Sequence, residues 1–118
     1  MSHPYYHAKS SAEKWGGTWE DYIPIHEWFD ASKAHVGDIR HRMLRHHAQG
    51  IFDCQKIFGE VFTVKSTGRL VPTRFIAEQH VSEDFGGKIP SLSSWIEELP
   101  IRSWMGAGTT RVSERFEN

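Results

Sequence analysis

The sequence contains almost no cysteine: Cys54 is the single one among 118 residues. One cysteine cannot form an internal disulfide framework, so we expect Cys54 to be a small core residue in a protein of a reducing compartment. No run of the sequence approaches the ~20 apolar residues that cross a membrane. The first residues also lack the basic and apolar blocks of a secretory leader. We therefore expect a cytoplasmic protein without a membrane partner.

The chain also lacks an excess of charge of either sign, because its formal net charge is only −1 at neutral pH. A protein with this balance is not attracted to nucleic acid as a whole, so a nucleic-acid partner is not favoured. The charges are uneven along the chain. Residues 33–47 carry an excess of basic side chains and residues 78–98 an excess of acidic ones. The simplest explanation is that the two segments pair with each other.

The chain is long enough for one hydrophobic core, and its apolar pattern is mainly helical. Apolar residues from Ile25 to Leu44 recur at the spacing of one helix face, and the pattern resumes after Gly50 up to Phe58. This spacing predicts a long second helix, with weak points at Gly37 and Gly50.

The other predicted elements are shorter and are bounded by glycine, proline or serine. They are a first helix from Ser10 to the Gly16-Gly17 pair, a hairpin of residues 61–64 and 69–71, a third helix over residues 74–85, and a fourth helix from Pro90-Ser91 to Leu99. Trp104-Met105 is expected to fold onto the core. The predicted fold class is mainly α: one small helical domain of about four helices with one short β-hairpin over residues 1–105, followed by a flexible polar tail over residues 106–118.

Two histidine–aspartate pairs indicate a metal site. His26 and Asp30 are four residues apart, and His80 and Asp84 repeat this spacing on another predicted helix. Residues four apart lie on the same face of a helix. Imidazole nitrogens and carboxylate oxygens are ligands of divalent metals of the zinc or manganese type. If the two helices lie side by side, the four residues complete one metal site. In the alternative, each pair is a hydrogen bond between neighbouring side chains, without an ion.

A cluster of basic residues indicates a site for an anion. The segment from Arg40 to His47 holds three arginines and three histidines. Guanidinium groups bind phosphate through paired hydrogen bonds, and imidazole exchanges a proton near neutral pH. We predict Arg40, His41 and Arg45 as ligand-binding residues of a phosphate-containing molecule or nucleotide, with Arg74 on a second side. His47 is the predicted catalytic acid or base.

Glu78 is a second candidate for a catalytic residue, because it lies two positions before His80 and can act as a base; alternatively, it pairs with an arginine. A different interpretation of the cluster is a solvated basic face that pairs with the acidic residues of the segment 78–98. On a straight helix, Arg42 and Arg45 point toward water and Arg40 lies on another side. The whole cluster therefore cannot converge on one ligand.

The order and spacing of several short strings give the sequence a resemblance to a known family. The strings are His7, Ser11-Ala12, Trp15-Gly16-Gly17, Glu20-Asp21-Tyr22, Ile25-His26, Phe29-Asp30, Arg40-His41-Arg42, Leu44-Arg45-His46-His47, Gly50-Ile51, Val71-Pro72-Thr73-Arg74 and Glu78-Gln79-His80-Val81. In these strings, from about His7 to Met105, the chain resembles a family of small uncharacterised proteins of bacteria and their phages, described as a domain of unknown function. The resemblance implies a cytoplasmic protein of bacterial or phage origin. It implies no activity, cofactor or catalytic residue.

These observations leave three functions open. The first is a metal-dependent hydrolase of a phosphate ester or nucleotide, in which the ion lowers the pKa of a bound water. The second is a non-catalytic protein that captures a nucleotide, such as a phage protein that sequesters a signalling nucleotide of its host. The third is a protein-binding module whose basic helix docks on an acidic partner. A homo-oligomer is compatible with all three. The repeated histidine–aspartate spacing favours the first.

Overall fold

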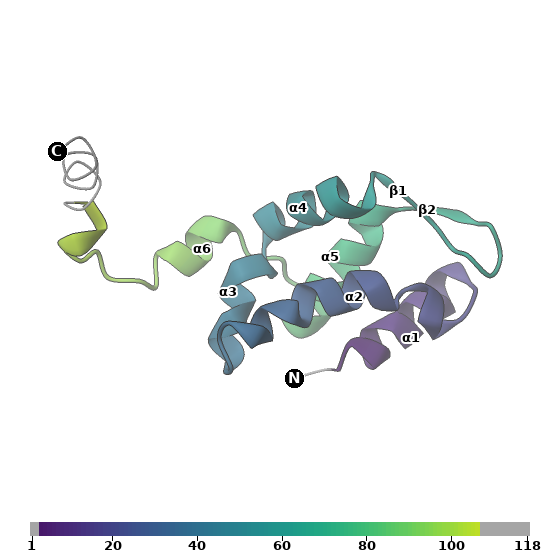
Figure 1. Cartoon of the computed structure of the whole chain (residues 1–118), viewed down its shortest axis with the longest axis horizontal. Coiled ribbons are helices and arrows are strands. Elements are labelled where there is room, and N and C mark those ends of the chain that lie inside the picture. The colour runs from purple at the N-terminus through teal and green to yellow at the C-terminus, as the bar shows by residue number, and fades with distance from the viewer. Residues whose placement is uncertain (1–2, 107–118) are drawn as a thin grey trace, which may run out of the picture.

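A computed structural model describes residues 3–106, which form short helices around a common core, with one β-hairpin (Figure 1). The elements are α1 (Pro4–Trp15), a 3-10 turn (Trp19–Asp21), α2 (Ile23–Asp30), two more 3-10 turns (Ala31–Ala34 and Ile39–His41), α3 (Arg42–Arg45), α4 (Ala48–Phe58), β1 (Val61–Thr63), β2 (Leu70–Pro72), α5 (Thr73–Asp84) and α6 (Leu92–Ile96). The mainly helical class and the hairpin are confirmed. The helices are shorter and more numerous than the four or so that were predicted.

The first helix begins earlier than predicted. Pro4 occupies the first turn of α1, and the side chain of His3 accepts a hydrogen bond from the backbone N–H of Tyr5. Proline is well suited to this position, because the first N–H groups of a helix have no partner within it. Ser11, which was expected near a helix start, lies instead on the buried face. Helix α1 packs against α2 and α5 through this face.

The predicted long second helix is wrong, because the chain breaks three times between residues 30 and 48. Helix α2 ends at Asp30, and the side chain of Asp38 accepts the N–H of Arg40 at the start of a new turn. The side chain of His47 then accepts the N–H of Gly50 and begins α4. Each capping side chain satisfies a free N–H and so starts a separate helix. Helix α3 consequently packs back against α2.

The hydrophobic core lies between α1, α2, α4, α5 and the hairpin. The two strands pair antiparallel, with Phe62 opposite Val71. The buried apolar residues are Ala8, Tyr22, Ile25, Phe29, Ile51, Cys54, Val64, Val71, Ile76, Ala77 and Val81. Cys54 is a core residue, as expected, and its burial raises the pKa of its thiol to about 12.

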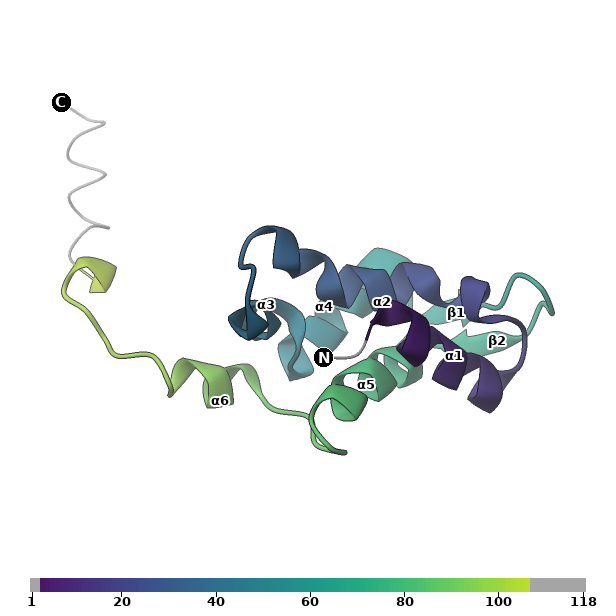
Figure 2. The same cartoon turned by 90° about the horizontal axis from the view of Figure 1, so that it is seen from below.

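The end of the described chain stands away from the bundle (Figures 1 and 2). Helix α6 is attached where the indole N–H of Trp95 donates to the carbonyl oxygen of His46. The expectation that Trp104-Met105 folds onto the core is wrong, because Trp104 is 72% exposed. Apart from Gly106, the predicted polar tail lies outside the described residues. Among residues 3–106, no helix is both long enough and apolar enough to cross a membrane.

Candidate metal centre

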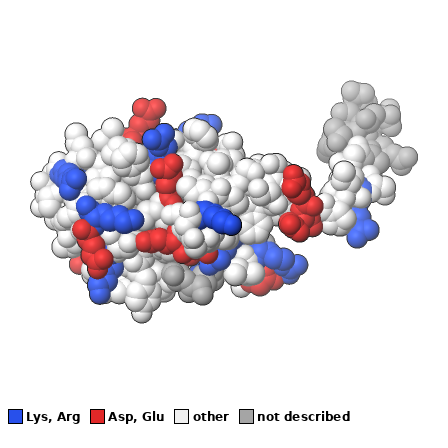
Figure 3. All heavy atoms as spheres, turned by 180° about the vertical axis from the view of Figure 1, so that it is seen from behind, with Lys and Arg blue, Asp and Glu red and all other residues white. Residues whose placement is uncertain are grey.

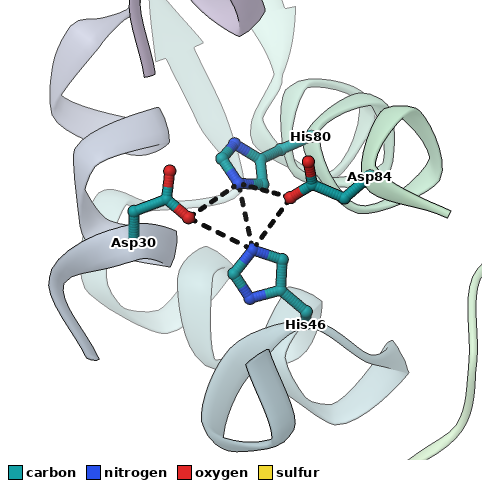
Figure 4. Close-up of side chains that lie close together, drawn as sticks. All are labelled: Asp30, His46, His80 and Asp84. Carbon is teal, nitrogen blue, oxygen red and sulfur yellow. Dashed lines mark hydrogen bonds and ion pairs between the residues drawn. The ribbon is translucent and has the colours of Figure 1, made fainter. Parts of the chain in front are cut away.

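Four side chains with metal-binding atoms meet inside the bundle (Figure 4). Asp30 comes from the end of α2, His46 directly follows α3, and His80 and Asp84 lie one turn apart on α5. One nitrogen or oxygen of each residue lies within 4.8 Å of those of the other three. We call these residues the Asp2His2 group.

The spacing of the four atoms matches that of a four-coordinate ion. Nε2 of His46 lies 3.1 Å from Oδ2 of Asp84 and 3.4 Å from Oδ1 of Asp30. Nε2 of His80 lies 3.5 Å and 3.6 Å from the same two oxygens, and the two Nε2 atoms are 3.2 Å apart. A zinc ion about 2.0–2.1 Å from each of four tetrahedral donors places them roughly 3.3–3.4 Å apart. These five separations are close to those of a tetrahedral metal site, and the sixth, between the two carboxylate oxygens, is within 4.8 Å.

The environment of the two carboxylates also suits a cation. Asp30 is only 6% exposed, and the Asp84 side chain only 1%. Among the described residues, their oxygens meet the ring nitrogens of His7, His46 and His80 and the guanidinium of Arg42 at 3.1–3.6 Å, but none of these contacts is a well-aligned hydrogen bond. Burial of an ionised carboxylate without such bonds is costly. A divalent ion between the two would balance both charges and satisfy one oxygen of each.

The protonation states are those that bind a metal. Burial by itself raises the pKa of Asp30, but the imidazoles of His46 and His80 outweigh this effect and hold the pKa well below its ordinary value. The pKa of Asp84 is depressed in the same way, against the effect of burial, by His46 and His7. Burial lowers the pKa of His80 to about 4. Near neutral pH both carboxylates are ionised and His80 is neutral, as coordination requires.

A chain of hydrogen bonds supports His80 from the side opposite the Asp2His2 group. Nδ1 of His80 lies 2.9 Å from Nδ1 of His26, and Nε2 of His26 lies 2.8 Å from the hydroxyl oxygen of Ser11. That hydroxyl donates to Oε1 of Gln79 at 2.8 Å. A metal on Nε2 of His80 leaves the ring proton on Nδ1, so all these bonds can then run in one direction, from His80 to Gln79. His26, a predicted ligand, is thus the support of a ligand in this geometry, and His46 occupies the fourth position.

Asp84 is held by two further groups on its outer oxygen. Its Oδ1 lies 3.2 Å from Nε2 of His7 and 3.4 Å from Nη2 of Arg42. Burial lowers the pKa of His7, but Asp84 and Glu83 outweigh burial, so the pKa is raised. Arg42 is buried, with its guanidinium group 5.3 Å from the centre of the Phe85 ring. The prediction that Arg42 points to water is wrong, because the helix on which it was placed is broken.

Sequence reasoning considered His46 only as an alternative to His47 for the acid or base and not as a metal ligand, and it gave His7 no role at the site. A usable signal for His46 was present: His47 stands three residues before Gly50, which is the spacing of a capping side chain and its N–H partner. With a new helix that starts at Ala48, His46 would no longer have been assigned to the face of one straight helix. No local pattern indicates His7, because its partners Glu83 and Asp84 lie at the other end of the domain sequence.

The arginines predicted to bind a phosphate have separate partners. Arg40 is exposed and pairs with Asp38 at 2.7 Å, which lowers the pKa of that carboxyl group to about 2. The guanidinium of Arg45 lies 4.3 Å from the centre of the Trp28 ring, and it donates to the carbonyl oxygen of the same residue. On the face in Figure 3, basic and acidic side chains are interspersed rather than gathered into one basic surface.

The remaining predicted site residues lie outside the Asp2His2 group. Arg74 and Glu78 approach each other to 3.9 Å on the exposed face of α5. His41 is buried, with Nδ1 2.9 Å from the hydroxyl oxygen of Ser32. His47, predicted as an acid or base, is buried and caps α4. The structure thus brings Asp30, His80 and Asp84 of the predicted site together, and leaves the predicted anion-binding and catalytic residues dispersed.

Comparisons with known proteins place the chain at the level of a family. No curated protein and no solved structure matches it. The family model described as "Domain of unknown function (DUF6915)" matches residues 2–105, a range that includes the whole Asp2His2 group. The chain therefore belongs to the DUF6915 family.

Proposed function

We propose that this protein binds one zinc ion through the Asp2His2 group and that the ion stabilises its fold. The observation that carries the proposal is the convergence of two imidazole nitrogens and two ionised carboxylates at a spacing close to tetrahedral, in a buried place where the carboxylate oxygens form no well-aligned hydrogen bond with a described residue. Two carboxylates balance the charge of a divalent ion. Imidazole binds a metal in its neutral form, so the two histidines would add nitrogen donors without further charge.

Zinc fits this group better than manganese, the other type of ion that the sequence suggested. Zinc accepts four nitrogen and oxygen ligands in a tetrahedron, whereas manganese prefers six, mostly oxygen. The five separations of 3.1–3.6 Å that involve the two imidazole nitrogens are close to the tetrahedral case. Zinc also binds nitrogen donors more tightly than manganese in the series of divalent metals.

The proposed role of the ion is structural. Structural zinc sites are closed by four protein ligands, whereas catalytic sites keep one position for water or substrate. All four members of the Asp2His2 group have buried side chains. The ion would join the end of α2, the turn after α3, and α5, so its binding energy would become part of the folding energy.

The hydrolase and the nucleotide-binding protein stay predictions of the sequence. Hydrolysis needs a metal position that a substrate can reach, and the burial of the Asp2His2 group argues against one. Nucleotide capture needs arginines that converge, whereas Arg40 and Arg45 are held by Asp38 and Trp28. The bacterial or phage origin and the cytoplasmic location likewise stay expectations.

Elemental analysis by plasma mass spectrometry on tag-free protein tests the proposal. We expect close to one zinc per chain in the wild type and little in Asp30→Asn or His46→Ala. Asp53→Asn, at a partly exposed position of α4, and His35→Ala, at an exposed position, are matched controls, because they change the same residue types away from the Asp2His2 group, and both should keep the metal.

Two results would contradict the proposal. One is a folded wild type that holds no metal after incubation with zinc and dialysis. The other is turnover of a phosphate ester by the zinc-loaded wild type that is lost in His46→Ala but kept in His35→Ala. The second result would replace the structural role by the hydrolase.

A further inference from the structure

The C-terminal end of the described chain leaves a row of apolar side chains uncovered. The segment of residues 100–105, which we name the arm, lies beyond α6 and leads away from the bundle (Figures 1 and 2). Ile101 is 94% exposed and Trp104 72% exposed, while Met105 and Leu99, which directly precedes the arm, are about half exposed. Large exposed apolar side chains that gather in one segment of a soluble protein often mark a binding surface.

An apolar groove lies at the root of the arm. Val36, Met43 and Leu44 form one side of the groove, and Trp95 and Leu99 form the other, around a volume of about 550 Å³. The groove is fixed to the bundle, because the indole N–H of Trp95 donates to a backbone carbonyl oxygen at 3.0 Å. It is large enough to receive bulky apolar side chains.

We propose that the arm of a second copy of this chain fills the groove, so that two copies exchange arms in a two-fold symmetric dimer. Groove and arm belong to the same chain, so one symmetric contact covers both surfaces in both copies. In its own chain the arm does not cover the groove, since Leu99 already forms one of its walls and the chain continues outward from there. Trp104 supplies the kind of large aromatic anchor that is common at the centre of interfaces.

The size and the charges of the two surfaces fit this partner. Burial of Trp104 alone removes ~150–250 Å² from water, and the other exposed apolar side chains of the arm and the groove walls add to the area that a stable interface needs. Arg40 and Glu98 both line the groove, and Arg40 is paired with Asp38, which leaves Glu98 to face Arg102 on the arm of the other copy, once in each half of the dimer. Figure 3 shows acidic side chains where the arm leaves the bundle and basic ones nearer its end.

The test is the mass of the full-length chain in solution, measured by light scattering and by sedimentation equilibrium over a range of concentrations. We expect a species of twice 13.6 kDa. Ile101→Asp and Trp104→Asp in the arm, and Leu44→Asp in the groove, should each raise the dissociation constant at least ~10-fold. Phe52→Asp, at a 59% exposed position of α4, is the matched control and should leave the dimer intact.

A charge exchange makes the test specific for the reciprocal contact. Glu98→Arg and Arg102→Glu should each weaken the dimer, and the two changes combined in one chain should restore it. A wild type that is monomeric at high micromolar concentration overturns the proposal, as does a dimer that tolerates both the arm and the groove variants. A monomer whose Trp104 is shielded from a quencher also overturns it, because the arm would then fold onto its own chain. The zinc content of every variant separates this outcome from a failure of the metal site.

Discussion

The Nδ1 atoms of His26 and His80 lie 2.9 Å apart in the interior of the bundle. Burial lowers the pKa of both imidazoles, so near neutral pH each ring is neutral and carries one proton. Only one proton fits between two ring nitrogens at this distance. A metal on Nε2 of His80 fixes this proton on Nδ1 of His80, so that His80 donates the hydrogen bond and His26 accepts it. His26 therefore acts on the ion through His80.

We predict that His26→Ala weakens zinc binding without abolishing it. The change removes the acceptor of the Nδ1–H of His80 and releases the ring from its orientation, and losses of such supports typically cost about 10- to 100-fold in metal affinity. Competition with a chelating dye measures the dissociation constant, with His35→Ala as the exposed control. At saturation the variant should still hold one zinc per chain. Complete loss of zinc would make His26 a ligand, and unchanged affinity would remove its supporting role.

Removal of the metal should lower the thermal stability of the wild type. An ion present at a thousandfold excess over its dissociation constant stabilises the folded state by about 4 kcal/mol. The loss of the circular dichroism signal on heating, with and without a strong chelator, gives the two unfolding midpoints. Asp30→Asn, which lacks one ligand of the proposed site, should show no response to the chelator. An identical midpoint for zinc-loaded and zinc-free wild type would contradict a structural ion.

The thiol of Cys54 should be inert in the folded protein. Its burial raises the pKa to about 12, so at mildly alkaline pH the thiol stays protonated, and the thiolate is the reactive form. We expect no reaction with a chromogenic disulfide reagent under native conditions and complete reaction in denaturant. The signal belongs to one site, because the chain has no other cysteine. Rapid reaction of the native protein would show that the core around α4 opens easily.

The parts of the fold that depend on neighbours in sequence were predictable. The third predicted helix, 74–85, nearly coincides with α5, Thr73–Asp84. The four-residue separation of His80 and Asp84 correctly placed both side chains on one face of this helix. The hairpin was recognised from its alternation and its turn residues. In each case the determining interactions span only a few residues.

The break between α2 and α4 was not predictable from the spacing of the apolar residues. From residue 25 to residue 44 they recur as on one continuous helix, but the side chains of Asp38 and His47 accept backbone N–H groups and so start new helical turns. The break folds α3 back on α2 and brings His46 to Asp30. A straight helix would have kept these two residues far apart. The fourth member of the Asp2His2 group therefore depends on tertiary structure.

Gly50 allows this break to be tested. A Cβ added at position 50 would overlap the backbone carbonyl oxygen of Arg45, so only glycine fits where the turn after α3 meets the first turn of α4. Gly50→Ala must shift the chain at Arg45 and hence His46, and forced overlaps of this kind cost about 1–3 kcal/mol, occasionally more. We expect a lower urea midpoint and weaker zinc binding together.

Gly37→Ala is the control for Gly50→Ala. A Cβ at position 37 would meet no atom within 4 Å, and the backbone there does not have the positive φ that favours glycine. The change should leave zinc binding intact and alter the free energy of unfolding little, with a small gain from the reduced freedom of the unfolded chain. If the two variants lose stability and zinc equally, the close approach at Gly50 does not position His46. If Gly50→Ala alone loses both, the break in the predicted helix and the metal site depend on the same contact.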